Sequence, residues 1–397
     1  MDSQVVAIQV WPLQVPLRRP FRHATAERAE ADPLVVEVEL ANGTIGFGET
    51  LPRPYVTGET AATVQAALRG VLLQALVDAR PESMSEALDL AESLPWKDRD
   101  GQGCPAARAA LELALLDAYS RFFQRDIVQM AGWFGVAGFG PPGSSRRVRY
   151  GLVLGSDEPR KLRQQIRLAR LCGIRDFKLK MGDADAGRDR ARLDAVMGIL
   201  SAGLRSRKVT LRMDANGAWQ PDAAAGVLAG LKGLPIAAVE QPTPRGTEET
   251  WRQIHDLCGL PIMADESLVT MQDAERLAQG RAVQALNVRI SKNGGLTAAV
   301  RLAELARRYN LALMVGCMVG ETAILSAAQV RLLQIVDNAA FAEGCYGRLL
   351  LRDDVGKRVQ FGYGGRVPKV ASRGLGMHVD RDRLASLCPE GPTRLSP

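Results

Sequence analysis

Apolar and polar positions alternate along the first fifty residues. Residues 5–10 and 34–40 follow a period of two, which predicts strands with one buried face. Asn42-Gly43 is a hairpin turn signal, and residues 45–49 form a third predicted strand. From about residue 60 to residue 119 the apolar spacing becomes helical. Strands followed by a block of helices predict an α+β domain, which we place at residues 1–140.

Beyond residues 132–146, a stretch rich in glycine and proline that indicates a linker, short apolar strands alternate with helical segments. The predicted strands are residues 148–153, 177–180, 209–214, 238–240, 262–264, 285–290 and 313–318. Seven such units favour a closed (β/α) barrel over an open sheet, with a degraded last unit near residues 341–344. We assign residues 141–348 to this barrel, and we expect residues 349–397 to return and pack on the first domain.

Charged residues stand where the predicted barrel strands end. Asp214, Glu240 and Asp265 end three successive strands, 26 and 25 residues apart. Equivalent strand ends converge on the carboxyl face of a barrel, so these three carboxylates are expected to meet and to need a cation. Hard oxygen ligands favour one Mg²⁺ per subunit, with Mn²⁺ as the alternative. Taken singly, each acid also fits the cap of the helix that follows it.

Lys178 and Lys180 lie two residues apart at a strand end and share one face of that strand. A lysine beside a metal-bound carboxylate suits the removal of a proton α to a substrate carboxylate, because the cation stabilises the negative charge that develops. The base must be neutral, and a nearby cation and a second ammonium both lower a lysine pKa. We therefore expect Lys180 to be the base and Lys178 to assist it. The alternative is a solvated lysine pair.

Composition excludes several classes of function. The net charge of +7 comes mostly from arginines spread along the chain, and the densest basic runs lack interleaved aromatic residues, so we expect no nucleic-acid partner. No long apolar run and no signal-peptide pattern occurs, so we expect a cytoplasmic protein without a membrane partner. The six cysteines contain no CxxC pair and the three histidines end no predicted strand, which argues against a disulfide scaffold and against zinc or iron.

Together these motifs resemble the enolase superfamily, and within it the muconate lactonizing enzyme subgroup, nearest to its dipeptide epimerases and muconate cycloisomerases. The resemblance rests on residues 46–49 (Gly-Phe-Gly-Glu), Lys178-x-Lys180, 214–216 (Asp-Ala-Asn), 240–242 (Glu-Gln-Pro), 264–267 (Ala-Asp-Glu-Ser) and 292–295 (Lys-Asn-Gly-Gly). It implies an α+β capping domain over a modified (β/α)₇β barrel, Mg²⁺ on the three acids, an acid/base at Lys180, a small carboxylate substrate and a homo-oligomer. The lack of a strand-end His–Asp pair argues against the mandelate racemase branch.

The sequence departs from the subgroup pattern at the end of the sixth strand. The subgroup carries a second lysine there, on the far face of the substrate, and the matching position in residues 287–292 is Arg289. An arginine stays protonated, so it is a poor base but a good stabiliser of negative charge. A shift in this alignment would instead make Lys292 the second base.

The end of the eighth predicted strand also departs from the subgroup pattern. Dipeptide epimerases are similar to this chain in the loop at residues 51–60, but they end strand eight with an Asp-x-Asp that binds the substrate ammonium, and here the stretch reads Glu343-Gly344-Cys345. Substrate specificity in the family lies in two capping loops, which correspond here to residues 17–26 and 51–58. The candidate substrate contacts are Arg22, Tyr55, Asn216, Glu266, Glu321 and Glu343.

The first hypothesis is an isomerase, a cycloisomerase or a racemase/epimerase, that forms an enediolate from a small carboxylic acid or amino-acid derivative. The catalytic candidates are Lys180, Lys178, Arg289 and Lys292. One alternative is a lyase that uses Lys180 alone, for a syn elimination, a dehydration or an o-succinylbenzoate-synthase-like reaction. The other is a binding protein that keeps the fold and the metal but has lost catalysis.

Overall fold

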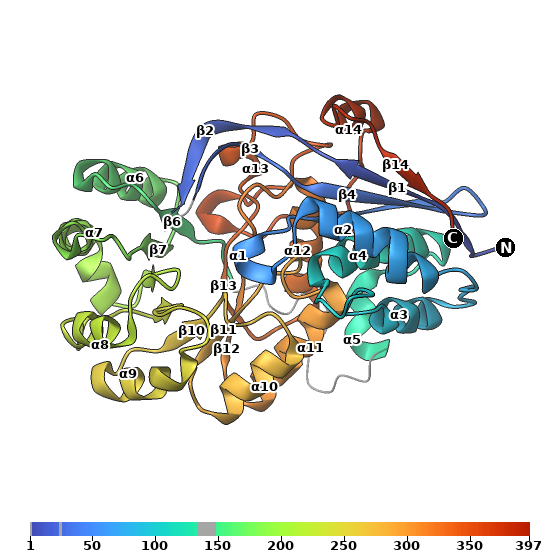
Figure 1. The fold of residues 1–397 in the computed structure, drawn as a ribbon. Coiled ribbons are helices and arrows are strands. Elements are labelled where there is room, and N and C mark those ends of the chain that lie inside the picture. The colour runs from blue at the N-terminus through green and yellow to red at the C-terminus, as the bar shows by residue number, and fades with distance from the viewer. Residues whose placement is uncertain (1, 24–25, 134–147) are drawn as a thin grey trace.

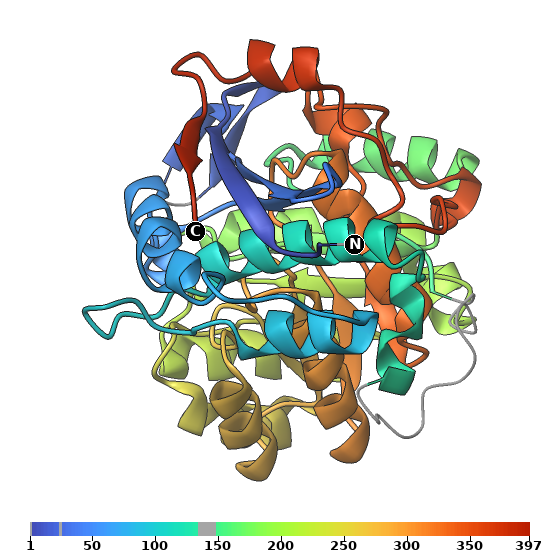
Figure 2. The ribbon, with the colours of Figure 1, turned by 90° about the vertical axis from the view of Figure 1, so that its right-hand side faces the viewer.

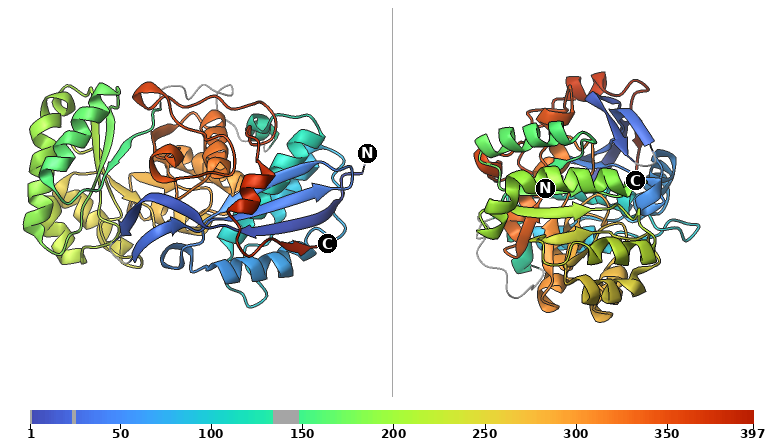
Figure 3. Two further views of the ribbon diagram at one scale, coloured as in Figure 1. Left: turned by 90° about the horizontal axis from the view of Figure 1, so that it is seen from above. Right: turned by 90° about the vertical axis from the view of Figure 1, so that its left-hand side faces the viewer.

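The computed structural model describes residues 2–23, 26–133 and 148–397. Its main bodies are an N-terminal α+β domain and a barrel, drawn in blue to cyan and in green to orange in Figure 1. Seen from above, the two bodies lie end to end, and the red C-terminal segment runs along them (Figure 3). None of the helices within the described ranges combines the length and the apolar character needed to cross a bilayer.

The N-terminal domain is built on an antiparallel sheet in the order β14-β1-β4-β5. Its strands are β1 (Val5–Pro12), β4 (Leu34–Leu40), β5 (Ile45–Thr50) and β14 (Thr393–Leu395). The last of these comes from the C-terminal end of the chain, and Figure 2 shows it in red alongside the blue strands. The prediction that the tail completes the capping domain is therefore confirmed.

Two glycines let the long helix α4 (Pro105–Phe122) lie close against this sheet. A Cβ at Gly46 or at Gly48 of β5 would overlap the backbone of α4 near Ala114 and Ala110. The Gly-x-Gly of residues 46–48 is therefore a packing requirement. The other longer helices of this domain are α2 (Ala61–Ala67) and α3 (Met84–Ser93), with short helices α1 (Pro54–Thr57) and α5 (Met130–Trp133) beside them.

The barrel is an eight-stranded parallel sheet in the order β13-β12-β11-β10-β9-β8-β7-β6. Its strands are β6 (Leu152–Leu154), β7 (Asp176–Lys180), β8 (Thr210–Asp214), β9 (Ala238–Glu240), β10 (Ile262–Ala264), β11 (Ala285–Val288), β12 (Ala312–Val315) and β13 (Ala339–Ala342). The sheet closes where Tyr150 pairs with Ala342 and the Gly151 N–H donates to the Ala342 carbonyl at 2.9 Å. The modified (β/α)₇β barrel is thus confirmed, including its short last unit.

In the part of the chain that the structure describes, seven helices surround the barrel: α6 (Pro159–Leu171), α7 (Ala186–Arg205), α8 (Pro221–Ala229), α9 (Trp251–Cys258), α10 (Met271–Gln279), α11 (Leu296–Arg308) and α12 (Ala323–Ile335). Two short helices follow them in the C-terminal part, α13 (Gly347–Leu350) and α14 (Arg381–Ser386). Small and large side chains from four adjacent barrel strands pack together in a separate buried cluster. That cluster consists of Ala238, Met263, Ala285 and Met314.

Most of one predicted loop proves to be strand. Of residues 17–26, taken as a capping loop, residues 17–23 and 26 fall in a two-stranded antiparallel ribbon of β2 (Val15–His23) and β3 (Ala26–Ala31), and the other two lie outside the described residues. The sequence did not predict β2 because it contains prolines at 16 and 20, and proline is depleted in strands. Proline is tolerated at the edge of a sheet, where its missing N–H is not needed. The linker prediction at residues 132–146 lies almost wholly outside the described residues.

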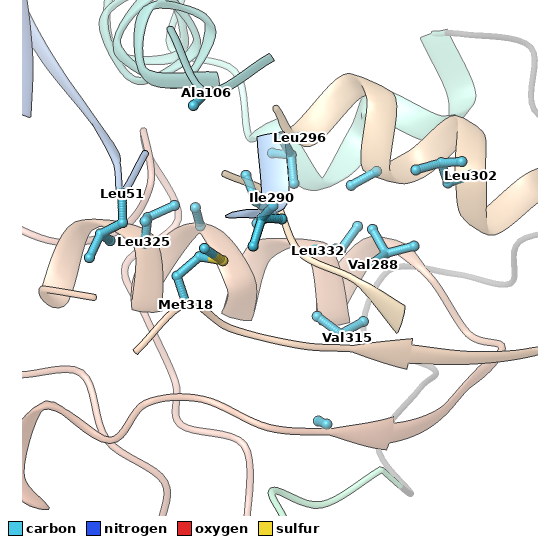
Figure 4. Packing of buried hydrophobic residues seen from close by; sticks show 14 of the residues in the cluster. Leu51, Ala106, Val288, Ile290, Leu296, Leu302, Val315, Met318, Leu325 and Leu332 are labelled. Atoms are coloured by element: carbon cyan, nitrogen blue, oxygen red, sulfur yellow. The ribbon is translucent and has the colours of Figure 1, made fainter. Parts of the chain in front are cut away.

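Apolar packing joins the two bodies. Figure 4 shows Leu51, from the capping domain, beside Leu325 of α12 and Met318, and Ala106 of α4 above Leu296. Buried glutamates add polar ties across the same seam. Glu49 accepts the N–H groups of Thr322 and Leu325 at 2.8 and 2.9 Å, at the start of α12.

Glu112 of α4 makes an equivalent tie to α11. Its carboxylate accepts the N–H groups of Leu296 at 2.8 Å and Thr297 at 2.7 Å. Both N–H groups lie in the first turn of α11, where backbone donors have no acceptor within the helix and a carboxylate is favoured. The capping domain is therefore anchored to the loop that carries the sixth strand end.

Replacing Glu112 by alanine is expected to lower the free energy of unfolding by about 3–5 kcal/mol, because it leaves two buried N–H groups without acceptors. Urea unfolding followed by circular dichroism measures the change. The matched control is Glu304→Ala on α11, whose carboxylate is partly exposed and lies 3.6 Å from Arg301. Equal losses in the two variants would refute the role given to Glu112.

Candidate active site

Three buried carboxylates stand at the ends of adjacent barrel strands. Asp214 ends β8 and Glu240 ends β9, and the two are paired in register. Asp265 directly follows β10. All three side chains are fully buried. The strand-end spacing in the sequence thus brings these acids to one edge of the barrel, as the sequence predicts.

The backbone after Glu240 orders the next strand end. Gln241 has a φ of 39°, and its side-chain oxygen accepts the N–H groups of Asp265 and Ser267, each at 3.1 Å. The Asn216 N–H similarly donates to Asp214 at 3.0 Å. Hydrogen bonds from the strand-end loops therefore hold the carboxylate of Asp214 and the backbone of Asp265.

Lys178 lies at the centre of the acidic cluster. Its Nζ is 3.1 Å from Asp214, 3.1 Å from Glu240 and 2.7 Å from Glu343. Burial lowers the pKa of Lys178, but these three carboxylates outweigh it and raise that pKa well above its ordinary value. This side chain is held as an ammonium, which suits a charge-balancing role and not that of a base.

Lys180 extends further toward solvent. Its Nζ is 2.7 Å from Asp214 and donates to the Asn216 amide oxygen at 2.7 Å, and 28% of the side chain remains exposed. It lines a cavity of about 330 Å³ above the carboxylates. Of the two lysines, Lys180 therefore has freer access to a molecule in that cavity.

Arg289 faces the same cavity from the opposite side of the barrel. It follows β11, and three strands separate β11 from β7 in either direction around the ring. Its guanidinium bonds to Asp265 and lies 3.6 Å from Glu240. Across the cavity, Lys180 thus has an arginine opposite it.

Lys292, the alternative second base, lies elsewhere. It is fully buried, and its Nζ is 2.9 Å from Asp265 Oδ1, 2.7 Å from the Asp265 carbonyl and 2.9 Å from the Asn287 carbonyl. Burial and Arg289 lower the pKa of Lys292 well below its ordinary value. The three acceptors nevertheless match the three N–H donors of an ammonium. These hydrogen bonds hold the Lys292 side chain beneath the site.

The donor set at the strand ends fits a hard divalent cation, since it offers three carboxylates within one buried edge. In the described residues, no three His, Cys, Asp or Glu side chains surround a common point as they stand. The gaps between the acids are bridged by Lys178, between Asp214 and Glu240, and by Arg289, between Glu240 and Asp265. These cations balance the negative charge that a bound metal would otherwise offset.

Most of the predicted substrate contacts line the cavity. Tyr55, Asn216, Glu266 and Glu343 do so. Glu321 instead precedes α12 and accepts the Met318 N–H, and burial raises its pKa to about 8. The side chain of Arg22 lies outside the described residues.

Sequence reasoning missed several residues of the site. Arg53, Asn287 and Cys317 line the cavity, and Arg212 lies just below it. Asn287 donates to Glu240 at 2.8 Å. Arg212 and Asn287 each precede a predicted site residue by two positions on a strand, so period-two spacing could have found them. No comparable signal marks Arg53.

Comparisons with known proteins agree with this geometry. The sequence model of the mandelate racemase / muconate lactonizing enzyme N-terminal domain matches residues 5–132, and the enolase C-terminal domain-like model matches residues 161–383. A hydrophobic dipeptide epimerase of Enterococcus faecalis is 28% identical over 86% of this chain and 90% of its own length. An L-Lys-D/L-Arg epimerase of Methylococcus capsulatus is 32% identical over 79% and 83%. A chloromuconate cycloisomerase of Cupriavidus pinatubonensis is 26% identical over 96% and 98%.

Solved structures show the same architecture. The L-Ala-D/L-Glu epimerase from Bacillus subtilis, in complex with a substrate, superposes with a TM-score of 0.79 at 25% identity. The match covers 94% of this chain and 98% of that one. The match therefore extends over both the capping domain and the barrel.

Proposed function

The chain belongs to the mandelate racemase/muconate lactonizing enzyme family of the enolase superfamily, and on that premise we propose that it is a Mg²⁺-dependent isomerase that removes the proton α to the carboxylate of a small acid. Its relatives include epimerases and cycloisomerases. The observation that supports the proposal most directly is the set of three buried strand-end carboxylates with Lys180 beside them at the cavity floor.

Asp214, Glu240 and Asp265 would hold the cation. When bound, Mg²⁺ supplies positive charge against the oxygens of the substrate carboxylate as an enolate develops. Lys178 remains an ammonium among the acids and limits their mutual repulsion. The fully buried strand ends also exclude water from the charged cluster, which strengthens each electrostatic contact.

Lys180 would take the α-proton on its side of the substrate. Asp214 and Asn216 each accept a hydrogen bond from its Nζ at 2.7 Å, so they orient the amine toward the cavity. Such positioning is required of a general base, which must lie within hydrogen-bond reach of the proton that it removes.

Arg289 would stabilise negative charge on the opposite side. A guanidinium cannot be deprotonated in a protein, so this face carries no second base at the expected position. The arrangement favours a reaction that needs only one base, and among isomerisations that is a cycloisomerisation. A racemase would need a proton donor or acceptor on each face.

A syn elimination is the second candidate, because the same pairing of Lys180 with Arg289 also suits a lyase. Both reactions begin with the same loss of the α-proton. They differ in the fate of the enolate, and the products distinguish them.

The proposal is tested by incubating small carboxylates in D₂O with Mg²⁺ and following α-deuterium and product by NMR. The set should include muconate-like diacids, N-acyl amino acids and dipeptides. We expect at least one compound to incorporate deuterium or to react, and EDTA to stop it. A complete absence of exchange and product across the set, unchanged by EDTA, would count against an enzyme of this type and in favour of a binding protein.

A further inference from the structure

A buried glutamate outside the cavity begins a chain of hydrogen bonds that ends at one of the three strand-end carboxylates. We infer that Glu248 is a positioning residue for the cation site. It acts through Ser267 and Gln241, which together hold the backbone at Asp265. The inference deepens the proposed function and rests on it, because it assigns part of the Mg²⁺ affinity to a side chain that does not line the cavity.

Gln241 is the link next to the cation site, directly after the acid that ends β9. Its side chain is fully buried, and its Oε1 accepts the N–H groups of Asp265 and Ser267, each at 3.1 Å. Its Nε2 donates to the Thr243 carbonyl at 3.0 Å and to Ser267 Oγ at 2.8 Å. These four bonds use both donors and both lone pairs of the amide. Gln241 therefore cannot turn without breaking one of them, and it ties the end of β10 to the end of β9.

Glu248 sets the direction of the serine hydroxyl. Because Ser267 Oγ accepts the Gln241 amide, its single proton points elsewhere, and it is donated to Glu248 Oε1. Glu248 opens the short 3₁₀ helix η3 (Glu248–Thr250) and is almost fully buried. Without this acceptor, a buried hydroxyl donor would have no partner, which is costly. The serine and the glutamine amide would then have to rearrange.

The carboxylate of Glu248 is held ionised at this position. Burial raises its pKa, but the hydrogen bond from Ser267 and the charge of Arg276 are among the contacts that outweigh burial and lower that pKa below its ordinary value. Arg276, on α10, lies 3.2 Å from Glu248 Oε2. Hydrogen bonds to an ionised acceptor are stronger than those between neutral groups. The chain of bonds therefore ends on a fixed charge.

The loop that carries Glu248 is also fixed from its other side. The fully buried Trp251 donates through Nε1 to Thr243 Oγ1 at 2.6 Å, and Thr243 Oγ1 lies 2.7 Å from Thr247 Oγ1. These contacts do not depend on the Glu248 carboxylate. If that carboxylate is removed, the rearrangement is therefore expected at Ser267 and the strand end before it, while η3 stays in place.

A Mg²⁺ site is sensitive to such a rearrangement. Mg²⁺ demands nearly ideal octahedral geometry with oxygens at about 2.0–2.1 Å, whereas Ca²⁺ accepts longer and more variable distances. Loss of a side chain that orients a metal ligand typically weakens metal binding by about 10- to 100-fold. Loss of the Glu248 carboxylate should therefore weaken Mg²⁺ binding more than Ca²⁺ binding.

The test measures Mg²⁺ and Ca²⁺ binding to the purified protein by isothermal titration calorimetry. We expect Glu248→Ala to weaken Mg²⁺ binding by about 10-fold or more and Ca²⁺ binding by less than about 3-fold. Glu248→Gln keeps an oxygen that accepts the Ser267 hydroxyl, so it should bind Mg²⁺ within about 3-fold of the wild type. Wild-type Mg²⁺ affinity in Glu248→Ala, equal losses for the two cations, or a Glu248→Gln as weak as Glu248→Ala overturns the inference.

The matched control is Glu59→Ala, because Glu59 is also buried and accepts the N–H groups of Ala106 and Ala107, at 2.8 and 3.0 Å, at the start of α4. It should lower the thermal stability and leave Mg²⁺ affinity unchanged. An equal loss of Mg²⁺ affinity in Glu59→Ala would show that the loss follows from stability alone, and it would overturn the positioning role.

Ser267→Ala tests the middle of the chain of bonds. It should weaken Mg²⁺ binding as Glu248→Ala does, and the double variant should bind no more weakly than either single variant, because both changes break the same connection. If Glu248→Ala does not fold, Ser267→Ala decides by the same measurement. Mg²⁺ binding by the wild type and unchanged binding in these variants overturns the inference and leaves the proposed function standing. No Mg²⁺ binding by the wild type overturns both.

Discussion

Replacing Lys180 by methionine is expected to slow Mg²⁺-dependent α-hydrogen exchange by about 10²- to 10⁴-fold, the usual contribution of a positioned general base. Methionine keeps the length of the side chain but cannot accept a proton. Substrate affinity should change little, because the carboxylate is held from the metal side. The measurement is α-deuterium incorporation by NMR under single-turnover and saturating conditions.

Two controls make the Lys180 result specific. Lys161→Met removes an exposed lysine of α6 that pairs with Glu158 at the surface, and it should leave exchange unchanged. Circular dichroism and thermal unfolding confirm that the Lys180 variant is folded. If Lys180→Met retains the wild-type exchange rate, another group removes the proton and the role assigned to Lys180 is wrong.

Replacing Glu240 by glutamine is expected to weaken Mg²⁺ binding by at least about 100-fold and to remove detectable exchange, since it takes one charge from a three-carboxylate set. Glu240 is the central acid, with Lys178 on one side and the Asn287 amide on the other. Wild-type protein should gain about 2.7 kcal/mol of stability at a Mg²⁺ concentration 100 times its dissociation constant. Calorimetry and thermal unfolding with and without Mg²⁺ measure both effects.

The matched control for Glu240 is Asp256→Asn, which removes an exposed acid of α9 and should leave Mg²⁺ binding intact. An identical Mg²⁺-induced stabilisation in the wild type and in Glu240→Gln would show that the cation binds elsewhere. If Glu240→Gln is less stable than the wild type when Mg²⁺ is absent from both, Glu240 has a structural role in place of a ligand role.

The sequence was sufficient to predict the barrel strands and the acids that end them. Periodicity identified β9 and β10 at their observed bounds, because these buried strands are short apolar runs that stop at Glu240 and Asp265. The same alternation placed Lys178 and Lys180 on one face. These features are local, so a few residues of sequence contain the information.

The ribbon of β2 and β3 could not be predicted in this way. Its residues include two prolines and several arginines, and its pairing depends on a register shift between Pro16 and Phe21. The ion pairs of Glu343 could not be predicted either, because its partners Lys178 and Arg212 are far from it in the sequence. Arg53 reaches the cavity because the capping domain packs on the barrel, which no local pattern records.

The distinction between Lys292 and Arg289 likewise needed the structure. Both lie within six residues of Asn287, and a shift of three residues in the alignment exchanges them. In the folded chain Lys292 is turned beneath the site onto the carbonyls of Asp265 and Asn287, while Arg289 lines the cavity. The bend of the chain after β11 separates them, and spacing along the sequence does not show it.

The most direct test of one-sided proton removal uses resolved enantiomers of a carboxylate that the enzyme accepts. Each enantiomer is incubated in D₂O with wild-type protein and Mg²⁺, and deuterium content and configuration at the α-carbon are followed together. With Lys180 as the base and Arg289 opposite it, one enantiomer should exchange its α-hydrogen with retention of configuration, and the other should not exchange. Exchange of both enantiomers with racemisation would contradict this account, because it requires a second base on the face that Arg289 occupies.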